Sequence, residues 1–156
     1  MDAIILLNWE KHWTISSQHY EENMTWNRRR GSALIDTEKG ILLVCQKNGV
    51  YMLPGGGASH AESRRSAAIR ELEEETGLKA ETVEYLFSIN SRRKKAHGGG
   101  LLRDNHKVFS ITSNGKPIPR HEIKKIAYFK PGSSILIDDI TKEIIEKYYE
   151  MTKLKN

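Results

Sequence analysis

The stretch that decides the fold is Gly56-Gly57-Ala58-Ser59-His60-Ala61-Glu62, followed shortly by Arg70-Glu71-Leu72-Glu73-Glu74-Glu75-Thr76-Gly77-Leu78. A glycine-rich turn leads into a charged segment whose apolar residues predict a helix over Glu62–Thr76. Four glutamates crowd the end of this helix, where like charges repel and acids oppose the helix dipole. Because this arrangement costs stability, we interpret it as a site that holds a hard cation.

Helical geometry places Glu71, Glu74 and Glu75 on one face, since they stand at positions i, i+3 and i+4. Glu73 points elsewhere and is expected to face solvent. Oxygen-only ligands suit Mg²⁺ or Mn²⁺, which usually complete their shells with water and substrate phosphate. The alternative is a solvated, charged face of an amphipathic helix.

The spacing from Gly56 through Glu62 to the segment 70–78 resembles the signature of the Nudix hydrolases, and every defining position matches. The resemblance implies the Nudix fold, an α/β/α sandwich with a mixed β-sheet between helices, over roughly residues 30–150. It also implies an enzyme in which water attacks a phosphorus of a nucleoside diphosphate linked to another group.

The same resemblance implies roles for the charged residues of the signature. Glu71, Glu74 and Glu75 match the family's metal-binding carboxylates. Glu71 or Glu74 is also expected to help deprotonate the attacking water. Arg70 matches the arginine that orients the neighbouring glutamates, and Glu62 matches the acid that pairs with this arginine or supports the metal shell.

The glycines of the signature have supporting roles. Gly55 matches a glycine whose backbone carbonyl reaches the metal, Gly56 opens the signature, and Gly77 is predicted to cap the helix in a left-handed conformation. Two positions depart from the common pattern, because many members have glutamate at Ser59 and glycine at Ala61. The first change leaves the number of metal ions open.

The substrate class follows less directly. Secondary markers of the coenzyme A, ADP-ribose and diadenosine polyphosphate types are missing, which favours a nucleoside triphosphate pyrophosphohydrolase, with oxidised nucleotides among the candidates. The first alternative is an ADP-ribose or nucleotide-sugar pyrophosphatase. The second is a non-catalytic module that binds a nucleotide or RNA.

Length and composition predict one domain over residues 1–156, with residues 1–30 as an N-terminal extension or added strand. No run approaches the ~20 apolar residues of a membrane span, and the N-terminus lacks the basic start of a signal peptide. The lone Cys45 suits a reducing cytoplasm. The apolar N-terminal residues are compatible with a homodimer.

Net charge is +5, which favours anionic partners: nucleotide polyphosphates first, and RNA second. Substrate-binding candidates outside the signature are Arg30, Arg92, Arg93 and Glu122. Arg92 and Arg93 lie in the segment 91–105. This segment is interpreted either as a cationic lid over phosphates or as a solvated loop. Glu122 is a candidate for a further metal ligand or general base. Trp26, Tyr51 and Phe109 are candidates to stack a base, and each is equally consistent with packing.

Hydrophobic patterning predicts a β-hairpin, four further strands and a C-terminal amphipathic helix. The expected hairpin strands are Gly31–Thr37 and Ile41–Gln46. The other expected elements are strands Tyr51–Leu53, Val83–Ile89, Lys107–Thr112 and Ile123–Phe129, and helix Ile140–Leu154.

Overall fold

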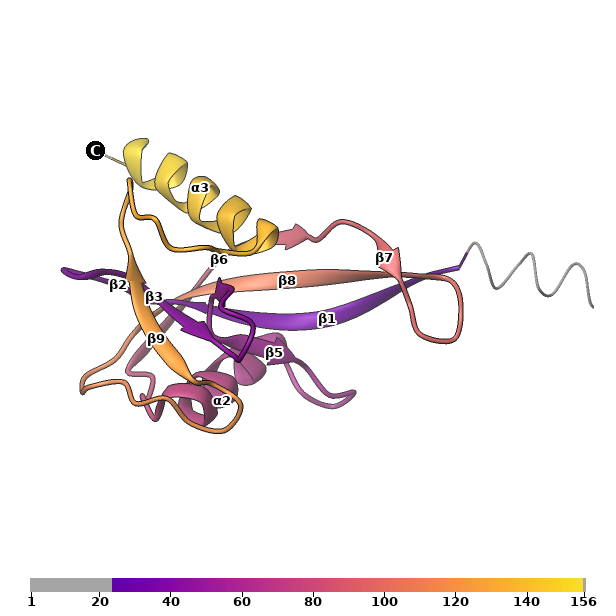
Figure 1. Ribbon diagram of the computed structural model, residues 1–156, viewed down its shortest axis with the longest axis horizontal. Coiled ribbons are helices and arrows are strands. Elements are labelled where there is room, and N and C mark those ends of the chain that lie inside the picture. Colours follow the sequence, from indigo (N-terminus) through magenta and orange to yellow (C-terminus); the bar gives the residue numbers. More distant parts are fainter. Residues whose placement is uncertain (1–23, 156) are drawn as a thin grey trace, which may run out of the picture. The chain divides into compact units, whose positions relative to one another are not determined.

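The computed structural model describes residues 24–155, and its helices and strands are drawn in Figure 1. The helices are α2 (Arg64–Thr76) and α3 (Asp139–Lys153). The strands are β1 (Thr25–Leu34), β2 (Asp36–Thr37), β3 (Gly40–Cys45), β4 (Tyr51–Met52), β5 (Gly55–Gly57), β6 (Thr82–Asn90), β7 (Lys94–Lys95), β8 (Leu101–Thr112) and β9 (Lys125–Phe129). This mixed α/β architecture confirms the predicted fold class.

The strands form two sheets. The first has the order β5-β1-β8-β6, with β7 paired to β8; the second has the order β2-β3-β4, with β9 paired to β3. The pairs β1–β5, β6–β8 and β3–β9 are antiparallel. Strands β1 and β8 run in the same direction, because residues farther along β1 bond to residues farther along β8. The first sheet is therefore mixed.

The chain divides into two compact units. The smaller unit includes residues 24–28 and 91–104, and the larger one includes residues 29–90 and 105–155. Strands β1 and β8 contribute residues to both. The prediction of a single domain over 1–156 stays a prediction, and most of the expected N-terminal extension lies outside the described residues.

The larger unit has a core on each side of its strands, as strand alternation requires. Ala33 and Leu42 pack with Leu72 of α2, whereas Leu34 and Leu43 pack with α3. Figure 1 shows the two helices on opposite sides of the strands. This is the predicted α/β/α sandwich.

Both helices begin at side-chain caps. Ser63 accepts a hydrogen bond from the backbone of Ser66, and Asp138 accepts one from Thr141. The close packing of α2 on β1 depends on Gly31, because a Cβ added there would lie 2.0 Å from the carbonyl oxygen of Arg64. The helix begins at Arg64, with Ser63 as its cap, two residues later than the predicted boundary at Glu62.

The predicted hairpin was partly wrong. Only Asp36–Thr37 pairs with the start of β3, while β1 begins at Thr25 and belongs to the other sheet. The chain leaves one sheet for the other at Ile35, which hydrophobicity could not reveal because the last four residues of β1 and Ile35 are all buried and show no alternation. Arg30 accordingly lies within a strand rather than before it.

Part of the segment 91–105 forms strands and is not a loop, while its role as a cationic lid stays a prediction. It forms the short strand β7 and the first residues of β8, joined by a turn over Ala96–Gly100. Three consecutive glycines in this turn have positive φ, which explains their place in the sequence.

Cys45 is buried at the end of β3, as expected for a core residue. Within residues 24–155, no helix is long and apolar enough to cross a membrane. The apolar N-terminal residues that suggested a homodimer precede the described part of the chain.

Candidate active site

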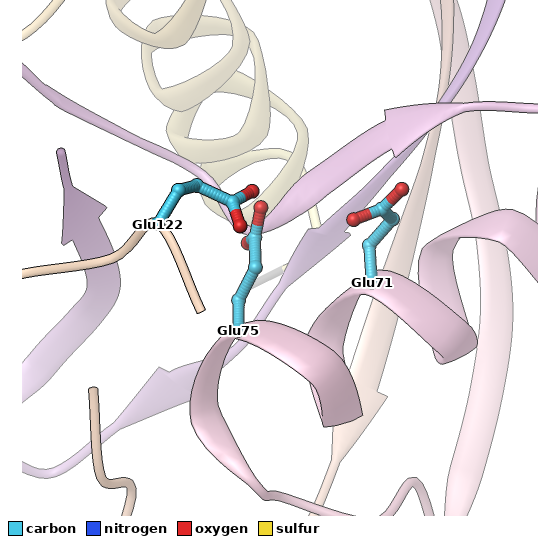
Figure 2. A group of neighbouring side chains, drawn as sticks. All are labelled: Glu71, Glu75 and Glu122. Atoms are coloured by element: carbon cyan, nitrogen blue, oxygen red, sulfur yellow. The ribbon is translucent and has the colours of Figure 1, made fainter. Parts of the chain in front are cut away.

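Three carboxylates meet beside the C-terminal half of α2. Carboxylate oxygens of Glu71, Glu75 and Glu122 lie within 4.8 Å of one another. Figure 2 shows Glu71 and Glu75 rising from successive turns of the helix, with Glu122 reaching toward them from the loop before β9. The helix thus supplies two carboxylates at i and i+4, and a distant segment supplies a third.

The position of Glu71 depends on Gly56. A Cβ added to Gly56 would lie 2.2 Å from Oε1 of Glu71, so any larger residue would displace this carboxylate. Gly55 beside it has a φ of 156°, and a Cβ there would lie 2.4 Å from the carbonyl oxygen of Gly31. Strand β5 therefore passes close to both β1 and the helix because it consists of glycine alone.

Glu75 is the buried member of the cluster, with 5% of its surface exposed. The pKa of its carboxyl is raised to about 8, chiefly by burial and next by the negative charge of Glu71, while the Gly55 N–H, which donates to Oε2 at 3.3 Å, opposes the rise. The negative charge of Glu122 also raises this pKa, and the positive charge of Arg30 lowers it. Without a cation, this group of acids is therefore electrostatically unfavourable when fully ionised.

Arg70 donates hydrogen bonds to three carboxylates, those of Glu62, Glu71 and Glu74. Its Nε donates to Oε1 of Glu62 at 2.8 Å, and its Nη1 donates to Oε1 of Glu71 at 2.8 Å and to Oε2 of Glu74 at 3.2 Å. Its Nη2 donates to the Gly57 carbonyl at 3.2 Å. A planar guanidinium can make all of these contacts at once, which an ammonium cannot. The hydrogen bonds to Glu62 and Glu71 raise the pKa of Arg70 despite its partial burial.

Glu62 is fixed by the turn as well as by Arg70. Its Oε2 accepts from the backbone N–H of Ser59 at 3.1 Å, and its own carbonyl accepts from Arg29 at 3.0 Å. The hydrogen bonds from Arg70 and Ser59 lower the pKa of the Glu62 carboxyl. Glu62 therefore stays ionised and holds Arg70 in place.

The loop that carries Glu122 is attached to the end of α2. The N–H groups of Ile118 and Arg120 donate to the carbonyls of Thr76 and Glu75, at 2.9 and 3.0 Å. His121 has a φ of 51°, in the left-handed region that non-glycine residues rarely adopt. This conformation directly precedes Glu122, so local strain occurs where the third carboxylate is positioned.

The helix ends as predicted. Gly77 has a φ of 72° and its N–H donates to the Glu73 carbonyl, which makes it a left-handed C-cap. The Arg120 guanidinium lies over Gly77, where an added Cβ would be 2.9 Å from its central carbon.

The three-carboxylate cluster fits a hard divalent cation. It offers oxygen ligands only, and one of its members is buried with a raised pKa that a cation would reverse. These features separate it from a solvated acidic face, in which each carboxylate would be exposed and have an ordinary pKa.

Comparison with known proteins gives the family. The model of the NUDIX domain matches residues 26–148. This chain belongs to the NUDIX family. The family relationship supports a pyrophosphohydrolase that acts on phosphorus-containing anhydrides, with a nucleotide derivative as substrate.

Solved NUDIX structures share the fold. A protein assigned to the nudix hydrolase family from Chromobacterium violaceum is 31% identical, with a TM-score of 0.67, and the match covers 80% of this chain and 78% of that one. A MutT NUDIX hydrolase from Burkholderia pseudomallei is 23% identical, with a TM-score of 0.68 and coverages of 78% and 97%. An ADP-ribose pyrophosphatase from Streptococcus suis is 22% identical, with a TM-score of 0.50 and coverages of 70% and 78%. At such identities the last two show the fold alone.

The NUDIX acids are not all equivalent in this structure. Glu122 joins Glu71 and Glu75, whereas Glu74 is outside this group of three and pairs with Arg70. The Glu74 side chain is 46% exposed and lines a pocket on the outer side of α2. Its predicted roles in metal binding and catalysis stay predictions.

The other predicted substrate contacts divide between the two units. Arg30 is near enough to Glu75 to lower its pKa. Arg92 and Arg93 belong to the smaller unit, and their contact with substrate stays a prediction.

Arg120 and His121 line the same pocket as Arg70 and Glu74, and neither was predicted from the sequence. They carry no periodic or motif signal, and only their neighbour Glu122 drew attention to this loop.

Proposed function

We propose that this NUDIX protein hydrolyses a diphosphate linkage of a nucleotide with the help of Mg²⁺ or Mn²⁺. The single observation that carries the proposal is the convergence of Glu71, Glu75 and Glu122 beside an arginine-braced helix. A cluster that serves only solubility has no reason to bury one of its acids.

Glu71, Glu75 and Glu122 are the residues that we propose to hold the cation, with the Gly55 carbonyl and Glu74 as further candidates. A divalent cation in this position supplies charge neutralisation at the phosphate oxygens and lowers the pKa of a bound water. Phosphoryl transfer needs little more, because positioning and electrostatic stabilisation dominate its catalysis.

The protein's own residues then divide the remaining work. Arg70 keeps Glu71 and Glu74 at fixed positions, and Glu62 keeps Arg70 oriented. Glu71, Glu74 and Glu122 remain the candidates to accept a proton from the attacking water. The attack forms a new P–O bond and breaks the bond from the same phosphorus to the bridging oxygen.

We propose nucleoside triphosphates, including oxidised ones, as the leading substrates. The basis is the absence of the sequence markers of other types. ADP-ribose and nucleotide sugars are the alternative, and they have the same P–O–P linkage.

A substrate panel tests the proposal. Purified protein with Mg²⁺, and separately with Mn²⁺, is incubated with normal and oxidised nucleoside triphosphates, ADP-ribose, nucleotide sugars and dinucleoside polyphosphates, and products are separated by anion exchange. Turnover that disappears in Glu71→Gln but persists in Glu73→Gln supports a hydrolase, because the two acids share a helix and only Glu71 is in the cluster. Binding without product in both metals would instead favour the non-catalytic module.

A further inference from the structure

The smaller unit contains a second charged feature, of the opposite sign to the acid cluster. We call residues 24–28 and 91–104 the basic ribbon. Its strands are the start of β1, β7 and the start of β8. Its charged residues are Arg28, Arg92, Arg93, Lys94, Lys95, Arg103 and Asp104. These give a net charge of +5 in 19 residues, equal to the net charge of the whole chain of 156. These 19 residues are therefore strongly basic.

Most of this charge is not compensated. Asp104 accepts a bidentate pair of hydrogen bonds from Arg28, at 2.6 and 2.9 Å, and lies 3.8 Å from the ammonium of Lys94. Arg92, Arg93 and Lys95 are exposed and form no ion pair with any residue of the range 24–155. Within residues 24–155, their side chains therefore carry positive charge that no acidic side chain neutralises.

The cations lie on both faces of the ribbon. Arg28 and Lys94 share one face, because both contact Asp104. Lys95 and Arg103 lie on the other face, since Lys95 pairs with Leu101, two residues before Arg103. A flat anionic surface could contact only one of these faces, whereas a flexible chain can follow both.

An aromatic ring accompanies this charge. Trp26 precedes Arg28 by two residues in β1, so it lies on the same face as the Arg28–Asp104 pair. The Trp26 residue is 54% exposed, the largest exposed fraction of any aromatic residue in the described range. An exposed aromatic ring among cations can stack an unpaired base while its neighbours contact phosphates.

We propose that the basic ribbon binds a single-stranded polynucleotide, with Arg92, Arg93 and Lys95 on phosphates and Trp26 stacked on a base. The exposed ring favours a single strand over a duplex, whose bases are stacked on one another. The placement of cations on both faces of the ribbon favours a flexible strand over a flat lipid surface. This binding does not depend on the proposed hydrolase activity, because none of its residues belongs to the acid cluster.

The test compares two triple variants of equal charge change. Arg92→Ser/Arg93→Ser/Lys95→Ser keeps Arg28, Lys94 and Asp104, so the ribbon retains its internal contacts. The matched control removes three exposed lysines of the larger unit, in Lys130→Ser/Lys142→Ser/Lys155→Ser. Both are measured by fluorescence anisotropy with a labelled oligouridylate of about 16 nucleotides, over a salt series, with far-ultraviolet circular dichroism as the folding control.

The ribbon variant is expected to bind at least ~10-fold more weakly than the control at low salt. It is also expected to lose about 2 units from the slope of log K against log salt, since each phosphate contact on a single strand contributes roughly 0.7. Trp26→Ala is expected to weaken binding at least about fivefold, with little change in this slope.

Three results would overturn the proposal. One is equal weakening in both triple variants, which would show that net charge alone matters. Another is no binding of the oligouridylate by the folded wild type. The last is sedimentation with anionic phospholipid vesicles that the oligouridylate does not compete away. The titration is repeated with Glu71→Gln to separate the two proposals. This variant is expected to bind the oligouridylate like the wild type, whether or not the hydrolase assay shows turnover.

Discussion

Substitution of Glu75 by glutamine should stabilise the metal-free protein while removing its response to metal. The folded protein holds the Glu75 proton up to a pKa of about 8, against an ordinary value of 4.5. Because the unfolded chain releases this proton at lower pH, the stability of wild type in EDTA should fall as pH rises from about 4.5 to about 8. Glutamine resembles the protonated side chain and can still accept the Gly55 N–H, so the variant should not show this loss.

The magnitude follows from the two pKa values. At pH 7.5 the free energy of unfolding of the wild type in EDTA is lower than at pH 4.5 by at most about 4 kcal/mol, at ~1.36 kcal/mol per pH unit. For a domain of this size that corresponds to roughly 8–16 °C in melting temperature. The assay is thermal unfolding in EDTA at pH 5 and pH 7.5, with Glu73→Gln as the control because Glu73 is exposed on the same helix.

The expected pattern is that Glu75→Gln melts well above wild type at pH 7.5 and close to it at pH 5. Mg²⁺ should then raise the melting temperature of wild type and of Glu73→Gln, but not that of Glu75→Gln. If Glu75→Gln and wild type melted together at both pH values, the carboxyl would have an ordinary pKa. The cluster would then not be electrostatically unfavourable in the absence of a cation.

Three further outcomes are expected. Gly56→Ala should weaken Mg²⁺ affinity at least ~10-fold in calorimetry, because its Cβ would meet the Glu71 carboxylate. Gly57→Ala has open space around its Cβ and should bind Mg²⁺ normally; equal affinities in the two variants would contradict the proposed position of Glu71. Arg70→Lys should lower kcat/KM by roughly 10–100-fold in the assay with the best panel substrate, since lysine cannot reproduce the forked contacts to Glu62 and Glu71; an unchanged rate would remove Arg70 from the mechanism. Mg²⁺ affinity should rise about tenfold per pH unit below pH 8, with release of one proton per ion, and a flat pH profile would show that binding does not deprotonate a ligand.

The charged signature predicted the positions of Glu71, Glu75 and Gly77 because these depend only on spacing along one helix. Helical spacing alone places Glu71 and Glu75 one turn apart, and Gly77 is recognisable as a cap from its position after the last periodic residue. Spacing could not predict that Glu74 lies outside the group of three. A side chain at the edge of a helix face can turn either toward the cluster or toward Arg70. The structure shows that it turns toward Arg70.

Non-local features were predicted less well. Glu122 joins the cluster across about fifty residues of chain, through backbone hydrogen bonds that depend on no side-chain type. The switch of the chain between sheets at Ile35 was missed for a related reason: strand residues buried on both faces show no alternation that would mark the change.

The attachment of the loop before β9 to the end of α2 has a consequence for how this scaffold can vary. Its closing residues are pinned to the last carbonyls of the helix, so the position of Glu122 is independent of the length of residues 113–117. Lengthening a flexible loop adds only a small entropic cost, about 0.6 kcal/mol per doubling. Insertions at 113–117 should therefore be tolerated, and this segment is a place where new substrate-recognition sequences can be grafted without moving the carboxylates.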